Sequence, residues 1–309
     1  MTKPVATPPS LHLTIKIGLY GSLLGLLYAS TIQWLVTRDW IRDDFNYAYV
    51  IPLVVIYLSW EKRDTLTAAG LQPSWLGLLP LGLGLGLFWL GELAGEFYML
   101  YLSLWLLIVA ICWLELGWGR VRTLGFAFVM LLTVFPPPNF IYGRISFYLK
   151  LASSALGVEM IRLCGMAAYR EGNIIDLGFT QLQVVDACSG LRYLIPLLVL
   201  ALLLVYFYRA SPWKRVLVVL SAVPLSVFTN SLRIALMGIL HRAFGPETAE
   251  GFFHGFSGWF IFMFSLGVLL LEMRVLRNLG RRRGKGERER DELPRPSGAP
   301  GEGRPPSRS

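Results

Sequence analysis

The chain has 309 residues, of which 54% are apolar or aromatic and only 16% are charged, whereas charged residues make up about 25% of ordinary soluble domains. Its mean hydropathy is +0.54, so it lacks the polar surface that a water-soluble fold of this size needs. A soluble enzyme, a disordered regulator and a disulfide-stapled secreted domain are therefore disfavoured. The composition predicts a multi-spanning membrane protein.

Positive charge gathers near the C-terminus. The formal net charge is +9, and residues 274–309 hold 11 Lys/Arg against 5 Asp/Glu. Beside a membrane span, a basic segment indicates topology before it indicates a nucleic-acid partner, and we expect no nucleic-acid binding. The abundance of Arg, Gly, Pro and Ser predicts that residues 276–309 form a disordered basic cytoplasmic tail. Residues 1–275 are predicted to be one membrane domain.

Eight hydrophobic segments predict an all-α integral membrane protein built as a bundle of about eight transmembrane helices. Most of them approach the ~20 residues that a helix needs to cross a bilayer. They cover residues 17–36, 46–60, 75–91, 97–117, 121–135, 191–208, 216–239 and 255–275. The first segment is too long and too weakly flanked for a cleaved signal peptide, so we interpret it as an anchor.

Basic residues in the loops predict the orientation of these helices. Lys and Arg follow the second, fourth, sixth and eighth segments, so all four groups lie on one side if the segments alternate. The positive-inside rule makes that side cytoplasmic, and both termini with it. Residues 37–45 and the loop with Glu92 and Glu96 then face outward.

Residues 136–190 form a long outer loop that is predicted to carry its own structure. Pro136–Pro138 ends the fifth segment, and apolar residues then recur every three or four positions from Phe140 to Leu163. This pattern predicts an amphipathic helix on the outer face of the bilayer. Beyond it, a turn at 171–173 and strands at 173–177 and 180–185 predict a small extracytoplasmic β element.

Three ionisable residues from three segments are predicted to meet at the outer side. Cys188 precedes the sixth segment, Arg233 lies deep in the seventh, and His254 precedes the eighth. A thiolate is a strong nucleophile, an imidazole exchanges protons, and a guanidinium presents a fork of donors to an oxyanion. Asn230, one short turn before Arg233, is placed to support it.

Each residue also has a structural interpretation. Cys188 could be a small buried residue, Arg233 could reach the outer headgroups, and His254 could be an interfacial hydrogen-bonding group. Their convergence favours chemistry, because the three structural explanations would have to coincide. One Cys and one His are too few ligands for a metal, and we expect no metal or other cofactor. Cys112 and Cys164 complete an odd, widely spaced set that argues against a disulfide framework.

The sequence resembles the exosortase/archaeosortase family. The blocks that carry the resemblance are Ala187-Cys188-Ser189-Gly190-Leu191-Arg192, Asn230-Ser231-Leu232-Arg233-Ile234 and Phe253-His254-Gly255, in that order. The segment Arg170–Ile174 and the proline run near 135–138 are also similar. The resemblance extends from about residue 45 to 275.

The resemblance implies an integral membrane cysteine transpeptidase in the bacterial cytoplasmic (inner) membrane. Cys188 would be the nucleophile, Arg233 the oxyanion stabiliser and His254 the acid and base, and Arg192 also matches a family position. The implied substrates are exported proteins with a C-terminal sorting signal, which consists of a short Pro-containing motif, one transmembrane helix and a basic cluster. The enzyme would cleave at the motif and pass the protein to an amine, glycan or lipid acceptor of the envelope.

Two other classes of protein fit the same spans. A membrane acyl- or glycan-transferase of polysaccharide export would share the outer loop but would not need Cys188. A transporter or assembly subunit would pair Arg233 with a carboxylate along a pathway. Replacement of Cys188 separates both from a transpeptidase.

Overall fold

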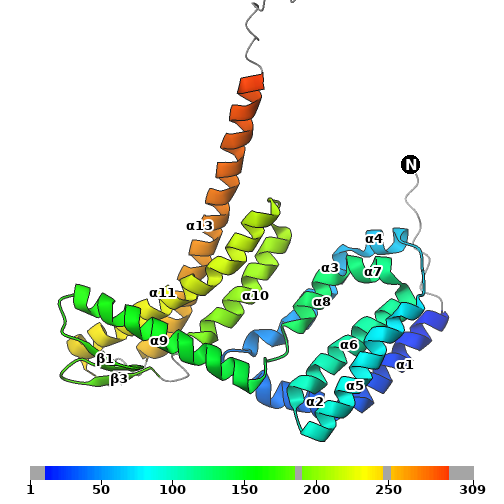
Figure 1. The fold of residues 1–309 in the computed structure, drawn as a ribbon, viewed down its shortest axis with the longest axis horizontal. Coiled ribbons are helices and arrows are strands. Elements are labelled where there is room, and N and C mark those ends of the chain that lie inside the picture. Colours follow the sequence, from blue (N-terminus) through cyan, green and yellow to red (C-terminus); the bar gives the residue numbers. More distant parts are fainter. Residues whose placement is uncertain (1–10, 185–189, 246–251, 292–309) are drawn as a thin grey trace, which may run out of the picture.

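The computed structural model describes residues 11–184, 190–245 and 252–291. These residues are mostly helical, with one small sheet. Figure 1 shows the helices α1–α8 on one side of the molecule and α9–α13 on the other. The two groups meet where Phe126 of α8 stacks on Tyr206 of α10, with 4.3 Å between the ring centroids.

The first group consists of eight α-helices and three short helical turns. The α-helices are α1 (Leu11–Leu27), α2 (Ala29–Trp34), α3 (Ile51–Glu61), α4 (Arg63–Ala68), α5 (Leu78–Ala94), α6 (Phe97–Leu116), α7 (Trp118–Thr123) and α8 (Gly125–Leu132). The turns are the π-helix η1 (Leu35–Asp39) and the 3-10 helices η2 (Asn46–Tyr49) and η3 (Trp75–Gly77).

Glycines at every seventh position bring the η3–α5 segment close to α6. A Cβ atom added to Gly77, Gly84 or Gly91 would lie within 3.0 Å of a leucine of α6. Ser103 adds a hydrogen bond across the same contact, donating from Oγ to the carbonyl of Gly84 at 2.6 Å. Small residues allow such close backbone approach between membrane helices, which makes α5 and α6 an antiparallel pair.

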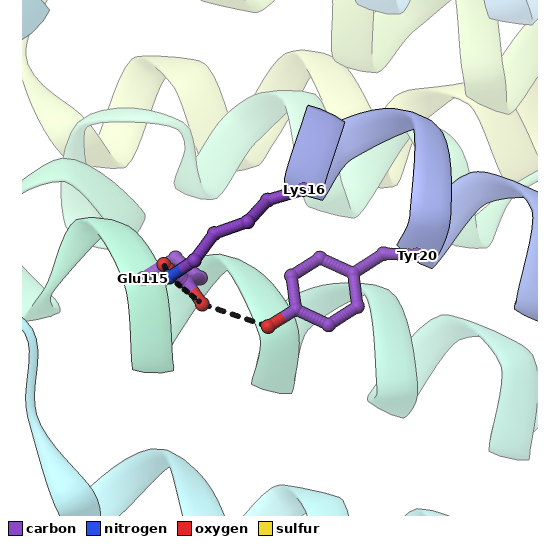
Figure 2. Close-up of polar contacts among 3 residues, drawn as sticks. All are labelled: Lys16, Tyr20 and Glu115. Atoms are coloured by element: carbon purple, nitrogen blue, oxygen red, sulfur yellow. Dashed lines mark hydrogen bonds and ion pairs between the residues drawn. The ribbon is translucent and has the colours of Figure 1, made fainter. Parts of the chain in front are cut away.

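Helix α1 is held against the end of α6 by a polar cluster. Figure 2 shows Lys16 and Tyr20 of α1 reaching Glu115 of α6. The Lys16 Nζ lies 2.9 Å from Glu115 Oε2, and Tyr20 Oη donates to Oε1 at 2.8 Å. Glu115 thus connects α1 to the end of α6.

The second group consists of the helices α9 (Asn139–Leu163), α10 (Leu191–Phe207), α11 (Pro212–Phe244) and α13 (Phe252–Asp291). The expected helix between Phe140 and Leu163 is confirmed as α9, which packs along α11. Its inward face combines small residues such as Ser153 and Gly157 with the apolar Val158 and Ile161, and all four are buried, while Tyr148 and Leu163 are 69% and 87% exposed. Part of the apolar stripe of the sequence therefore faces away from the protein.

A three-stranded antiparallel sheet packs between α9 and the end of α11. Its strands are β1 (Tyr169–Glu171), β2 (Ile174–Asp176) and β3 (Gln181–Gln183), in the order β1-β2-β3. Ile175 is fully buried against Ile161 of α9 and Ala235 of α11. The expected turn at 171–173 and both expected strands are present, with narrower bounds, while β1 was not anticipated.

The structure does not confirm eight transmembrane helices. Among the described residues, four helical stretches are long and apolar enough to cross a membrane: Trp75–Ala94, Phe97–Leu116, Pro212–Phe244 and Gly258–Asn278. A fifth is present if Ile15–Leu27 and Ala29–Asp39, which meet at a 73° bend, form one span.

The remaining three expected spans are shorter for identifiable reasons. The segment 46–60 begins as the 3-10 helix η2, and 121–135 is divided at Leu124 between α7 and α8. Helix α10 has 17 residues, which rise about 26 Å against ~30 Å of hydrocarbon.

The basic loops gather at one end of the molecule. In Figure 1, α4, α7, the α10–α11 connection and the later part of α13 point toward the same end, opposite α9 and the sheet. Hydrogen bonds join these loops: Tyr206 Oη to Glu61 Oε2 (3.1 Å), Arg120 Nε to the Ala69 carbonyl (2.8 Å) and Tyr208 Oη to the Met273 carbonyl (2.7 Å). The expected segregation of basic loops from the outer loop is thus present in the fold.

Helix α13 extends into the segment for which we expected disorder. It is helical from Phe252 to Asp291, which includes most of the basic residues after position 276. The prediction of a disordered tail therefore applies only beyond that helix, at residues that lie outside the described part of the chain.

Candidate active site

Arg233 is buried inside the second group of helices. Its side chain lies on α11 with 2% of its surface exposed, so it does not reach out to the headgroups. Its guanidinium carbon lies 5.5 Å from the centroid of the Tyr193 ring on α10. Because a buried guanidinium is costly unless it is engaged by other groups, this position favours a functional over a snorkelling role.

Asn230 holds the start of α10 against α11. It is 1% exposed, and a Cβ atom added to Gly190 would lie 3.3 Å from its Cγ. Gly190 itself has a φ of +87°, in the left-handed region that favours glycine. Its carbonyl accepts a hydrogen bond from Ser226 Oγ at 3.4 Å. The residue that opens α10 is thus fixed to the helix that carries Arg233.

Cys188 lies outside the described residues, but the chain on both sides of it is described. Upstream, the amide of Val184 donates to the carbonyl of Asn173 at 2.9 Å, and Asn173 Nδ2 donates back to the carbonyl of Val184 at 3.0 Å. Downstream, Gly190 contacts Asn230. The segment that contains Cys188 is therefore anchored at one end to the sheet and at the other end to α11.

His254 falls in the first turn of α13, and its side chain lies outside the described side chains. One turn further along, Gly258 contacts Tyr193, since a Cβ atom there would lie 3.3 Å from Tyr193 Cζ and would overlap the hydroxyl. Deeper in the helix, Ser265 Oγ donates to Thr229 Oγ1 at 3.3 Å. The first turns of α13 thus lie beside both α10 and α11.

Arg192 links this region to the first group of helices. Its Nη1 lies 2.7 Å from Asp43 Oδ2 in the loop between η1 and η2, and its Nη2 donates to the hydroxyl of Tyr193 at 2.8 Å. Asp43 is exposed while Arg192 is mostly buried. The ion pair therefore joins residues 37–45, which were predicted to face outward, to the start of α10.

A cavity of about 530 Å³ opens beside these residues. Its lining combines polar groups with aromatic and apolar ones, and consists of Asp43, Asn46, Tyr47, Arg192, Tyr193, Pro196, Gly258, Trp259 and Phe262. A pocket with a few polar groups in an apolar wall is typical of ligand-binding sites.

Arg233 and Asn230 lie on α11, and Arg192 lies at the start of α10. Tyr193 contacts both Arg192 and Arg233. The meeting of Cys188, Arg233 and His254 stays a prediction. Sequence reasoning missed Tyr193 and Gly258, and the only signal for Tyr193 was its place directly after Arg192.

The chain was also compared with known proteins. No curated protein and no solved structure matches it. The family of transmembrane exosortases matches residues 40–271, which is well over half of the chain and includes α3 to α11 and the first turns of α13. Together with several apolar helices of spanning length, this match identifies a multi-pass membrane protein and implies a transpeptidase-type activity. The chain belongs to the transmembrane exosortase family.

Proposed function

We propose that the protein is a membrane-embedded cysteine protease and transpeptidase with Cys188 as its nucleophile. It would cleave the C-terminal sorting signal of exported proteins at the outer membrane face and transfer them to an acceptor in the envelope. The observation that carries the proposal is that Arg233 of α11 is buried against Tyr193, near the start of α10. Tyr193 follows Cys188 by five residues in the sequence. Family membership adds independent support.

The reaction would proceed through a thioester. The Cys188 thiolate attacks the scissile carbonyl carbon, and Arg233 donates hydrogen bonds to the oxyanion that develops. The C–N bond then breaks, and His254 gives a proton to the leaving amine. An acceptor amine attacks the thioester, loses its proton to His254 and releases the Cys188 thiolate. Water in place of the acceptor would complete hydrolysis instead.

Asn230 and Arg192 would support this chemistry without taking part in bond changes. Asn230 fixes Gly190, two residues after Cys188. Arg192 fixes the loop between η1 and η2 to α10 through Asp43. Both would hold the nucleophile segment at a constant distance from α11, since small displacements from a reactive geometry cost large factors in rate.

The location follows from the charge pattern. The end of the molecule with the basic loops would face the bacterial cytoplasm, with both termini there, because positive loops stay inside. Helices α3, α7–α8 and α10 would then complete the crossings that their length alone does not establish. The site would lie at the outer interface, where a substrate anchored by one transmembrane helix presents the residues that precede it.

The experiment that tests the proposal compares cells that produce the wild-type protein, Cys188→Ala or Cys188→Ser. Quantitative mass spectrometry of protein C-termini measures how many exported proteins keep an intact signal. We expect intact signals to accumulate in both variants at equal expression and membrane insertion. Unchanged C-termini in both would contradict the proposal, and would favour a transferase or transport subunit of polysaccharide export, which needs no thiol at this position.

A further inference from the structure

Tyr193 occupies the point where the elements of the candidate site meet. It is 8% exposed and stands two positions into α10. Its ring faces the guanidinium of Arg233 at 5.5 Å, and its hydroxyl accepts a hydrogen bond from Arg192 Nη2 at 2.8 Å. Gly258 of α13 lies against the same hydroxyl. A single side chain thus contacts α11, α13 and its own helix.

We propose that Tyr193 is a positioning residue that holds the Arg233 guanidinium in one fixed orientation. The proposal rests on the proposed function, because it assigns Arg233 to the oxyanion of that reaction.

The chemistry of the contact supports this role. A guanidinium over an aromatic face is attracted by the ring quadrupole, and the attraction strengthens when both groups are shielded from water. An arginine side chain has four rotatable bonds and adopts many conformations unless neighbours restrict it. The flat ring of Tyr193 restricts the Arg233 side chain through its aromatic face, a contact that does not itself use an N–H donor of the guanidinium.

The hydroxyl of Tyr193 fixes the ring in turn. It accepts a hydrogen bond from Arg192, whose other nitrogen is paired with Asp43 at 2.7 Å. On the far side only a glycine fits, because any side chain at position 258 would overlap the hydroxyl. The ring is therefore clamped between the Asp43–Arg192 pair and α13, and a change at either place is transmitted to Arg233.

The first test measures how fast iodoacetamide alkylates Cys188 as a function of pH, in a Cys112→Ser/Cys164→Ser background in detergent. A nearby guanidinium lowers the pKa of a thiol, so the apparent pKa of alkylation reports how Arg233 is placed. Arg233→Gln should raise that pKa, and Tyr193→Leu should raise it in the same direction. Tyr193→Leu should add no further change to Arg233→Gln, whereas Tyr193→Phe, which keeps the ring but loses the hydrogen bond from Arg192, should fall between the wild type and Tyr193→Leu.

Tyr206→Leu is the matched control. Tyr206 lies at the other end of α10, and its ring contacts the Lys62 ammonium group at 5.5 Å, so the same substitution removes a similar contact far from the site. An unchanged alkylation profile in Tyr193→Leu, while Arg233→Gln shifts it, would overturn the inference. The proposed function itself would survive that result, since it fails only if Cys188→Ala leaves sorting signals processed.

The second test uses suppression. Gly258→Ala should displace the Tyr193 ring and raise the alkylation pKa, and adding Tyr193→Phe should restore it at least halfway, because the overlapping hydroxyl is then gone. A purely structural fault at position 258 would not be relieved by removal of that one oxygen. Equal profiles for Gly258→Ala with and without Tyr193→Phe would count against the clamp.

Discussion

Gly190 lies directly against the side chain of Asn230, because a Cβ atom added to Gly190 would lie 3.3 Å from Asn230 Cγ. The contact joins the residue that opens α10 to the helix that carries Arg233. Gly190 also has a φ of +87°, so both the backbone and the available space call for glycine here. In the sequence, Gly190 follows the proposed nucleophile Cys188 by two residues.

Gly190→Ala should impair the enzyme through this contact. The left-handed backbone costs a residue with a Cβ about 1–2 kcal/mol, and the new methyl group meets Asn230. We expect a lower thermal unfolding temperature in detergent and slower signal processing. Gly143→Ala on α9, where a Cβ meets open space, should behave like the wild type. Equal stability of the two variants would show that the Gly190 contact does not constrain the site.

Substitutions on the packed face of α9 should destabilise the protein, whereas substitutions on its exposed face should not. Gly157→Leu places a large side chain where a Cβ already lies 3.1 Å from Ile234 Cγ2 on α11, and overpacking of this kind costs about 1–3 kcal/mol. Leu163→Ser changes a residue that is 87% exposed and should leave the unfolding temperature nearly unchanged. Thermal unfolding monitored by size-exclusion chromatography distinguishes the variants, and the reverse order would contradict the packing of α9 on α11.

Arg233→Lys should lose most of the activity while the protein stays folded. The point charge survives, but the planar fork of donors does not, and loss of an oxyanion donor lowers kcat about 100-fold. Pulse-chase labelling measures the effect as the rate at which newly made substrate proteins lose their sorting signal. Turnover within a factor of two of the wild type would exclude an oxyanion role for the guanidinium.

Thiol labelling in intact cells should report the orientation. Cys164 follows α9 and is exposed, while Cys112 is half-buried in α6. We expect a membrane-impermeant maleimide to label Cys164 and Cys188 but not Cys112, and Cys188 alone in the Cys164→Ser protein. Labelling that appears only after the cytoplasmic side is opened would reverse the proposed topology.

Much of the second group of helices was predictable, because local signals mark it. The proline run and the three-to-four residue spacing defined α9, and Glu171-Gly172-Asn173 marked the turn between β1 and β2. The packed face of α9 was only partly predictable from hydrophobicity. Small residues such as Gly157 mediate contacts between membrane helices, and a hydrophobic pattern does not single them out.

The first group of helices shows where the pattern is least informative. The apolar run 121–135 carries nothing that separates one continuous helix from the broken pair α7 and α8. Likewise, Arg233 could be recognised as a candidate from its unusual position in a hydrophobic segment, and Arg192 from its match to a family position, whereas Tyr193 could not. Its role depends on contacts with α11 and α13, which are distant in sequence and become adjacent only through packing.

The central claim is that Cys188 and His254 meet beside Arg233, and disulfide trapping tests it most directly. In the Cys112→Ser/Cys164→Ser background, His254→Cys is oxidised mildly with copper phenanthroline, and the cross-linked peptide pair is quantified by mass spectrometry. A disulfide requires Cα atoms within about 7 Å. We predict rapid cross-linking of His254→Cys to Cys188 and none for Leu271→Cys, about 25 Å further along α13. Cross-linking of His254→Cys no faster than that of Leu271→Cys would contradict the account.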